Sequence, residues 1–379
     1  MGKKSNNVSA TSDAGKLSNI EYCSNLYNEA KKDATLYKCE PEDWMWMPKP
    51  VRTAVAMVTL TLFACTFLVV PLLSIFLIPA VWRIAPVFST CFVGSAVLSM
   101  VLPAREWEWG RKLGQLWYEV LDLHCNTPPE YRRLVTKERD TMKLIMAMHP
   151  HGIVPFHAVL WAAFCDQYYQ IDGKKLYGFG AAADVVQYLP FLRNVMGWLS
   201  AGGADYKVLL DGLEHGRCPP VNAVGRECTK NLFILPGGIA EVFTSTPRKH
   251  AIVFKKRKGL IRLSLETGAL LCPTYVFGAT DFFENLATNE SSIFAQFSRK
   301  FRMGVTIFWG LWGTPVPYCP KISLCIAEPI PVEQWDKSKG PIPADLVEKL
   351  HQQYLDAIVD VFETYKAAAG HPDAELIIQ

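Results

Sequence analysis

Two long uncharged runs dominate the first third of the chain. Residues 53–82 carry no charged side chain, and residues 84–104 form a second such run after the single Arg83. Each run reaches the roughly 20 apolar residues that cross the hydrocarbon core of a bilayer. The pattern predicts a hairpin of two hydrophobic helices over residues 51–104, which either spans the membrane or re-enters it. A buried pair of soluble helices is the alternative, and the length of the charge-free pattern disfavours it.

The residues around this hairpin predict its orientation. Residues 1–50 are polar and lack the apolar stretch and cleavage site of a signal peptide. Lysine and arginine concentrate on the cytoplasmic side of membranes, and tryptophan concentrates in the headgroup layer. We therefore expect a polar cytosolic segment over 1–50, then the hairpin, with both chain termini in the cytosol. The flanking residues that carry this prediction are Lys49, Arg52, Arg105, Arg111, Lys112, Trp107, Trp109 and Trp117.

Beyond residue 105, short apolar runs alternate with longer amphipathic stretches. The amphipathic stretches 258–267 and 344–369 predict helices, the first of them closed by Gly268. The alternation is typical of an α/β fold in which helices flank a sheet. We expect one catalytic domain over residues 105–379. Buried strands are predicted at 143–148, 231–235, 270–277 and 322–326.

The net charge of the chain argues against nucleic-acid binding. The net charge is only +3 over 379 residues. A nucleic-acid-binding protein usually carries a strong basic field. We therefore expect membrane lipids as partners and no nucleic acid.

Two histidines follow the first predicted strand of the domain. His149-Pro150-His151-Gly152 comes directly after the apolar run 143–148, where a strand leaves the sheet and α/β folds often bind ligands. An imidazole with a pKa near ~6.5 can take the proton of an attacking alcohol. A chance surface pair is the alternative. Both imidazoles are candidate bases, and we favour His151 because Gly152 opens access to it.

A glycine pair and an acid follow the second predicted strand. Gly237 and Gly238 end the run 231–235, and Glu241 comes three residues later. Backbone N–H groups here, together with the backbone at Gly152, are candidates for holding an oxyanion, and Glu241 is a candidate for orienting a histidine. Alone, such a Pro-Gly-Gly segment is usually just a turn.

A cluster of basic residues lies before the helix predicted at 258–267. It contains no acid and is suited to the phosphates of a nucleotide-bearing molecule or to an anionic membrane surface. A solvated face is the alternative. The cluster consists of Arg248, Lys249, Lys255, Lys256, Arg257 and Lys258.

Other chemistries have weaker signals. Residues 178–183 form a degenerate dinucleotide fingerprint, and the chain has no GxSxG nucleophile motif. His149, His151 and His157 could bind a metal, but no HExxH motif supports this. We expect no metal and no cofactor.

These motifs resemble the type-2 diacylglycerol acyltransferase family, which includes monoacylglycerol and wax-alcohol acyltransferases. The similarity covers most of residues 100–370. It rests on the His149–Gly152 turn, on Gly237-Gly238 with Glu241, on the central block 258–278, and on residues 328–332 and 351–366. Leu260 and Gly202-Gly203 depart from the family pattern, and the histidine–aspartate dyad of the wider glycerolipid acyltransferases is absent.

The resemblance implies a glycerolipid-acyltransferase-like mixed sheet flanked by helices behind the membrane hairpin. It implies residence in the endoplasmic reticulum membrane, or on lipid droplets, with acyl-CoA as donor and a lipid alcohol as acceptor. We expect an acyl-CoA:diacylglycerol O-acyltransferase that makes triacylglycerol by direct transfer, with His151 as base. The acyl-CoA phosphates would bind Arg248, Lys255, Lys256, Arg257 and Lys258.

Three alternatives remain open at the level of sequence. The acceptor could be a monoacylglycerol or a long-chain alcohol. The protein could be a thioesterase that uses water as acceptor. It could also be a non-catalytic lipid-binding membrane hairpin protein.

Overall fold

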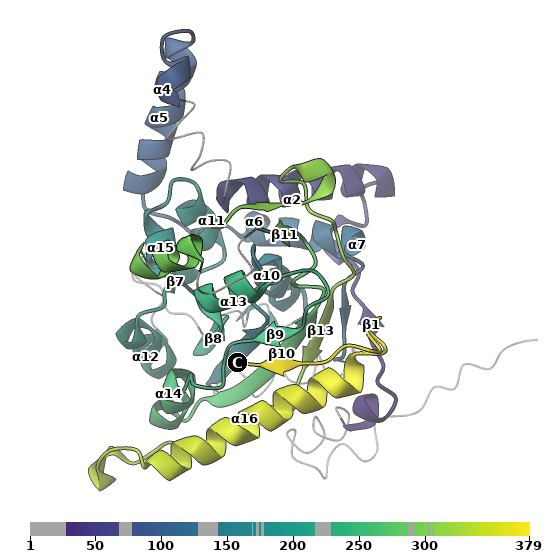
Figure 1. Ribbon diagram of the computed structural model, residues 1–379, viewed down its shortest axis with the longest axis vertical. Coiled ribbons are helices and arrows are strands. Elements are labelled where there is room, and N and C mark those ends of the chain that lie inside the picture. Colours follow the sequence, from purple (N-terminus) through teal and green to yellow (C-terminus); the bar gives the residue numbers. More distant parts are fainter. Residues whose placement is uncertain are drawn as a thin grey trace, which may run out of the picture.

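An eight-stranded mixed sheet runs through the molecule (Figure 1). The computed structural model describes residues 28–67, 78–127, 143–168, 170–171, 174–175, 178–216, 229–286, 292–301, 304 and 306–379. In spatial order the strands are β1 (Tyr37–Lys38), β2 (His124–Cys125), β13 (Ser323–Ile326), β10 (Leu270–Phe277), β3 (Leu144–His149), β8 (Asn231–Ile234), β6 (Phe179–Ala182) and β7 (Ala201–Gly203). The pairs β10–β13 and β1–β2 are antiparallel and the others parallel. The predicted mixed sheet flanked by helices is therefore confirmed.

The four predicted strands are all present near their predicted positions. The strand β10 has the predicted bounds, and β8 ends one residue earlier than expected. The strand β3 begins and ends one residue later than predicted, so it includes His149. This shift matters for the site, because His149 belongs to the sheet and not to the loop.

The strand β3 supplies side chains to the cores on both sides of the sheet. Leu144, Met146 and Met148 belong to one hydrophobic cluster, and Ile145 and Ala147 belong to the other. This alternation follows from the pleat of a β-strand, in which successive side chains point to opposite faces. The central strand is therefore buried throughout, which explains its uninterrupted apolar sequence.

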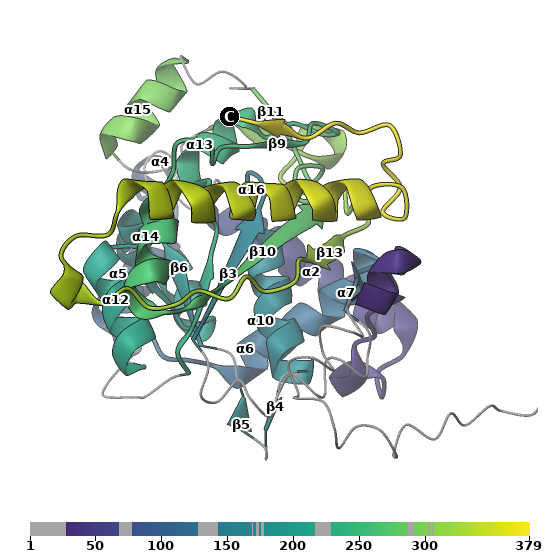
Figure 2. The ribbon, with the colours of Figure 1, turned by 90° about the horizontal axis from the view of Figure 1, so that it is seen from below.

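Helices cover both faces of the sheet. On one face α16 (Ala344–Tyr365) packs on β10 and β13, with α14 (Gly259–Thr267) and α12 (Tyr206–His215) beside it (Figure 2). The buried side of α16 carries the predicted apolar residues, but the helix ends at Tyr365 and not at 369. On the other face lie α10 (Phe156–Tyr168), α6 (Glu108–Leu113) and α7 (Trp117–Val120).

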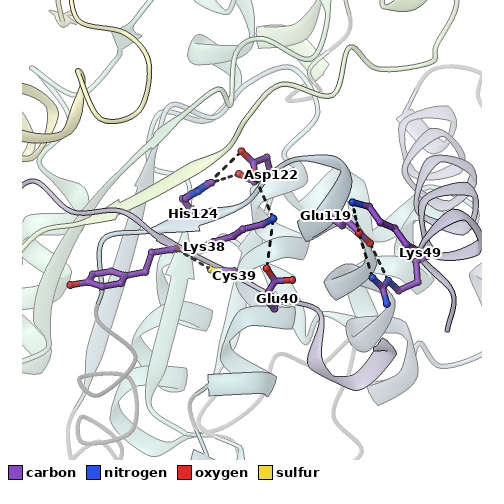
Figure 3. Close-up of polar contacts among 9 residues, drawn as sticks. Lys38, Cys39, Glu40, Lys49, Glu119, Asp122 and His124 are labelled. Carbon is purple, nitrogen blue, oxygen red and sulfur yellow. Dashed lines mark hydrogen bonds and ion pairs between the residues drawn. The ribbon is translucent and has the colours of Figure 1, made fainter. Parts of the chain in front are cut away.

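The beginning of the first apolar run forms a helix that lies along the domain built around the sheet. This helix, α2 (Lys49–Phe67), packs against α7, with Phe63 and Leu60 buried in the core. Arg52 at its start forms an ion pair with Glu119 at 3.0 Å, and Lys49 approaches the same carboxylate at 3.5 Å (Figure 3). The opposite face of α2 is apolar and exposed. Within the described residues it is the one helix long and apolar enough to cross a membrane.

The end of the first apolar run and the second run together form an arm that projects from the domain. It contains α4 (Ile78–Val81) and α5 (Pro86–Val101), which contact each other (Figure 1). Ser89 is the only buried residue of α5, so a buried pair of soluble helices does not describe this arm. A short turn at residues 82–84 joins α4 to α5, whereas α2 lies across the domain. The connection through 68–77 falls outside the described residues, as do residues 1–27 of the predicted N-terminal segment.

The C-terminal residues return to the sheet side that carries α16. The strand β14 (Ile377–Ile378) pairs in parallel with β9 (Ala251–Ile252), next to α13 (Gly238–Thr244) (Figure 1). The remaining elements are β4 (Gln170–Ile171), β5 (Lys174–Lys175), β11 (Glu284–Asn285), β12 (Phe308–Trp309), α11 (Leu192–Trp198) and α15 (Ile293–Phe301), with short 3₁₀ turns between them.

Candidate active site

The two candidate histidines lie in different environments. His149 is the last residue of β3, paired with Tyr275 of β10, and its side chain is fully buried. His151 lies two residues beyond, in the loop that leaves the sheet, and is partly exposed. The prediction that both imidazoles lie in the loop is therefore wrong for His149. As a strand residue it shares the face of Ile145 and Ala147, which α16 covers.

The sheet brings the glycine–acid motif next to the histidines. β3 and β8 are parallel neighbours with Ala147 opposite Ile234, so the segments that follow them meet at one edge. The helix α13 begins there and carries Glu241, whose side chain is buried. A Cβ atom at Gly237 would lie 1.7 Å from Cδ of Glu241. Glycine at this position is what makes room for the carboxylate.

Glu241 accepts three hydrogen bonds. Oε1 accepts from Nδ1–H of His149 at 3.0 Å and from the backbone N–H of Val253 at 2.9 Å. Oε2 accepts from the backbone N–H of His151 at 2.6 Å. Burial alone would raise the pKa of Glu241, but His149 and the two backbone N–H groups outweigh it and hold the pKa below its ordinary value. A buried carboxylate thus ties together the end of β3, the loop and the segment after β9.

His149 uses both ring nitrogens within the protein. Nδ1 faces Glu241, and Nε2 lies 3.1 Å from the hydroxyl of Tyr354 on α16. With Nδ1–H donating to the carboxylate, the Tyr354 hydroxyl donates to Nε2 of the neutral ring. The ring also packs edge-on against Phe254 at a centroid distance of 5.3 Å. Both ring nitrogens of His149 therefore already have partners within the protein.

His151 keeps one ring nitrogen available. Its Nδ1 lies 2.9 Å from the carbonyl oxygen of Gly152, so Nδ1–H donates and Nε2 carries the lone pair. Within the described part of the chain, no group forms a hydrogen bond with this Nε2. Desolvation by burial lowers the pKa of His151, against smaller opposing effects of the Gly152 carbonyl and Glu241. The ring is therefore a neutral proton acceptor at neutral pH.

Gly152 has a different role from the one expected. It is buried with φ +68°, and a Cβ there would lie 2.5 Å from the carbonyl oxygen of Ala279. It allows the loop to pack closely on the segment after β10, and does not open a path for substrate. The preference for His151 rests on its free nitrogen.

The expected oxyanion donors are partly engaged elsewhere. The N–H of Gly238 donates to the carbonyl oxygen of Leu235 at 3.1 Å, which closes the turn after β8. It is therefore committed to the fold, contrary to the expectation from sequence. The N–H of Gly237 has no hydrogen-bond partner among the residues that the structure describes.

The basic cluster is only partly at the site. Nη1 of Arg257 donates to the carbonyl oxygen of Pro236 at 3.0 Å, and lies beside Gly238. Lys258 forms an ion pair with Glu348 of α16. Arg248, Lys255 and Lys256 are exposed. Arg257 is thus the member of the cluster that the fold brings to the glycine turn.

Three groups at or near the site were not assigned their place there from the sequence. Tyr354 matches the predicted apolar side of its helix, and its contact with a histidine 205 residues away depends on how α16 packs. Val253 contributes only its backbone N–H, which nearly any residue type would supply. His157, considered above only as a metal ligand, is fully buried behind the loop.

The weaker alternatives from sequence have structural explanations. Gly178 precedes β6, and a Cβ there would lie 1.9 Å from the carbonyl oxygen of Asn231. This glycine allows two strands to pack, which accounts for the resemblance to a dinucleotide motif. In the described ranges, no group of three or more histidine, cysteine, aspartate or glutamate side chains is placed to hold a metal ion.

Comparison with known proteins relates this site to an enzyme family. A family model described as diacylglycerol acyltransferase matches residues 104–379. Diacylglycerol O-acyltransferase 2 of Mus musculus is 31% identical over 255 residues, which cover 62% of this chain and 60% of that protein. Acyl-CoA wax alcohol acyltransferase 1 of Mus musculus is 27% identical over 339 residues, which cover 84% of this chain and 94% of that protein.

Among solved structures, the crystal structure of the 1-acyl-sn-glycerophosphate acyltransferase PlsC from Thermotoga maritima is similar, with a TM-score of 0.33 and 14% identity. The alignment covers 83% of this chain and 97% of that one.

Proposed function

Because the chain belongs to the diacylglycerol acyltransferase family, we propose that it transfers the acyl group of an acyl-CoA to a lipid alcohol, with a diacylglycerol as acceptor. The product is then a triacylglycerol, and coenzyme A leaves. The relative with 31% identity, a diacylglycerol O-acyltransferase 2, supports this choice of acceptor.

The single observation that carries the proposal is the hydrogen bonding of His151. Its Nδ1–H is held by the Gly152 carbonyl, and its backbone N–H by Glu241, so Nε2 is left as an oriented acceptor. A neutral, oriented imidazole is what general-base removal of an alcohol proton requires. His149 holds Glu241 in place from the other side and acts as a positioning residue.

The reaction proceeds by direct transfer. The acceptor hydroxyl loses its proton to Nε2 of His151 as its oxygen forms a bond to the thioester carbon. The electron pair of the carbonyl moves onto oxygen. When the tetrahedral intermediate collapses, the C–S bond breaks, and the thiolate of coenzyme A takes the proton back from His151. Protons and charge balance without a covalent enzyme intermediate.

The surface of the protein supports a site at the lipid boundary. Val58 and Leu62 on the outer face of α2 and Val97 on α5 are exposed, as is Trp312 in the turn after β12. Exposed apolar surface of this extent is typical of membrane contact. Cys319, in the segment that follows this turn, contacts Met57 of α2 at 3.5 Å, so these elements lie on one side of the domain. Lipid substrates would reach the site from there, and the phosphates of coenzyme A would remain near Arg257.

A long-chain alcohol is the second candidate acceptor. The match to a wax alcohol acyltransferase extends over 84% of this chain, more than the 62% of the match to the diacylglycerol enzyme. A monoacylglycerol belongs to the same chemical class.

A competition assay tests the proposal. Microsomes that carry the protein receive labelled acyl-CoA with equal amounts of diacylglycerol, monoacylglycerol and a long-chain alcohol. We expect triacylglycerol as the main product, whereas mainly wax ester would select the second candidate. Free fatty acid without neutral lipid would indicate a thioesterase.

The His151→Ala variant tests the base. Loss of a general base typically lowers the rate by about 10² to 10⁴-fold. His124→Gln, on strand β2 between β1 and β13, serves as the matched histidine control and should retain activity. If neither wild type nor variant transfers acyl groups to any of the acceptors, the protein is the non-catalytic alternative.

A further inference from the structure

His157 is a buried imidazole that has no hydrogen-bond partner in the structure. It lies at the start of α10, its side chain is fully buried, and neither Nδ1 nor Nε2 meets a partner among the described residues. Leaving a buried polar group unsatisfied destabilises the folded state. Such groups are rare in native proteins and are found where a ligand, ion or water completes them. A leucine would fill a similar volume without this cost.

The position of His157 relates it to the site. It follows His151 by six residues, at the end of the same loop, and interacts electrostatically with His151 and, more weakly, with His149. The neighbouring Phe156 packs against Phe63 of α2, with ring centroids 5.6 Å apart. The start of α10 is therefore close both to the catalytic loop and to the helix on the lipid-facing side.

The proposed reaction needs a donor that the glycine turn does not fully supply. Negative charge develops on the thioester oxygen when the alcohol attacks, and preorganised N–H donors in a water-excluded site stabilise it. The N–H of Gly238 is already used within the turn. Within the described site, His157 is the buried side-chain donor that remains without an acceptor.

We propose that the ring N–H of His157 donates a hydrogen bond to the carbonyl oxygen of the acyl thioester, and so binds the oxyanion while His151 holds the proton. This inference rests on the proposed acyl transfer and deepens it. His157 is then a catalytic residue with a role distinct from that of the base. The other ring nitrogen needs a donor, and a buried water or the acceptor lipid could supply it.

The electrostatics of His157 suit this role. Burial, with the neighbouring His151 and His149, lowers the pKa of His157 to about 3. The ring therefore stays neutral when His151 becomes protonated, and two adjacent imidazolium charges never arise. A neutral imidazole whose pKa is depressed can still act as an N–H donor to a developing oxyanion.

The test compares His157→Leu with His157→Gln and the wild type. Leucine removes the donor and keeps most of the volume, whereas the glutamine amide can restore a donor. We expect His157→Leu to lower kcat by about 10² to 10³-fold, the usual effect of losing one oxyanion donor. The KM for acyl-CoA should change less than about threefold, and His157→Gln should recover part of kcat. Binding of a thioether analogue of acyl-CoA, which lacks the carbonyl oxygen, should be equal in wild type and His157→Leu.

Thermal unfolding separates catalysis from folding. Since leucine removes an unsatisfied polar group, His157→Leu should unfold at the wild-type temperature or above it. His250→Leu is the matched control, because His250 is also buried but its Nδ1 is bonded to the Tyr275 hydroxyl at 2.8 Å. That control should unfold at a lower temperature and retain kcat.

Each contrary result has a distinct meaning. If folded His157→Leu keeps kcat within twofold of wild type while His151→Ala loses activity, the imidazole binds a buried water only, and the inference fails while the proposed function stands. If the acid limb of the pH–rate profile disappears in His157→Gln, then His157 is the base and the inference also fails. If the wild type transfers no acyl group, the proposed function itself is wrong.

Discussion

At the scale of single residues, Glu241 determines the geometry of the site. It accepts hydrogen bonds from the His149 ring, the His151 backbone and the Val253 backbone. The sequence suggested one partner for this acid, whereas the structure provides three. Each partner comes from a different segment. The carboxylate therefore fixes the loop of His151 relative to these segments, and with it the orientation of the His151 imidazole.

The pH dependence of activity follows from the position of His151. Burial lowers the pKa of this histidine below its usual 6.5. A base is active when unprotonated, so activity should be full above that pKa and should be lost as the pH falls through it. We expect the acid limb of kcat/KM to lie below pH 6.5, in assays from pH 4.5 to 8.

The unfolding temperature must be recorded at each pH in the same experiment. Because the folded-state pKa of His151 is depressed, the stability it contributes is present above the unfolded pKa and is lost as the pH falls. A fall in rate that merely follows unfolding would not count. An acid limb at or above pH 7 would contradict the assignment of the base.

Arg257 should determine part of the affinity for the donor. Its guanidinium lies beside Gly238 and donates to the Pro236 carbonyl, next to the proposed reaction centre. If it contacts a phosphate of coenzyme A, Arg257→Gln should raise the KM for acyl-CoA about tenfold. This is roughly the loss of affinity expected when one charge-assisted hydrogen bond is removed. Steady-state kinetics at low and high salt measure this.

Arg248→Gln is the control for a general effect of charge. Arg248 is also exposed and basic but lies before β9, where its backbone N–H bonds to Asp281. Equal effects of the two variants would show that the cluster acts as a diffuse charged surface and that Arg257 has no special contact.

At the scale of elements, the C-terminal strand supports the carboxylate from a distance. The backbone of Gln379 donates to the Ile252 carbonyl at 2.9 Å and accepts from the N–H of Phe254, also at 2.9 Å. In extended backbone, the residue between Ile252 and Phe254 directs its N–H away from the Gln379 side. That residue is Val253, whose N–H bonds to Glu241. The strand β14 and Gln379 therefore hold the N–H of Val253 in position to bond to Glu241.

Removal of residues 376–379 should lower both stability and rate. The deletion removes at least four backbone hydrogen bonds to residues 250–255, at roughly 1 kcal/mol each. It also frees Val253 to move away from Glu241. We expect a lower unfolding temperature and a fall in kcat of at least about tenfold, measured on the same preparation.

Gln379→Ala is the matched control for that deletion. It keeps the backbone bonds and removes only the side chain, so it should behave as wild type. If the deletion lowers the unfolding temperature but leaves kcat unchanged, β14 contributes to stability alone.

At the scale of the whole molecule, one side of the protein is unusually apolar. The helix α2 rests on the domain with its outer face exposed, and α5 projects from the same end (Figure 1). Ser99 near the end of α5 accepts from the backbone N–H of Phe191, which links the arm to the domain. The loop that carries His151 thus lies on a domain to whose core the exposed apolar helices are attached.

Charges on the projecting arm should weaken membrane attachment. Val97 and Val101 of α5 are 52% and 73% exposed. A lysine in the hydrocarbon region costs about 2.5 to 3.5 kcal/mol, so Val97→Lys with Val101→Lys should make the protein extractable from microsomes by alkaline carbonate. Val97→Leu with Val101→Leu, which preserves apolarity, should resist extraction as wild type does. If the lysine variant also resists, α2 rather than the arm holds the protein on the membrane.

The sequence by itself determined the local features of this protein. Strands, helices and apolar runs depend on residues that are near one another in the chain. The spacing of the hydrophobic residues, together with Gly268 as a helix end, was therefore enough to predict β10, α14 and most of α16. The candidate residues His149, His151 and Glu241 also came from short motifs. The family resemblance then connected these motifs to acyl transfer.

Only the tertiary structure decided how those residues are used. Whether an imidazole nitrogen is free depends on partners far away in the chain, as with Tyr354 for His149 and Val253 for Glu241. The same holds for α2, which sequence alone assigned to a two-helix hairpin and which packs instead on α7. Hydrogen bonding and burial are properties of three-dimensional contacts, and a pattern along the chain does not encode which contacts form.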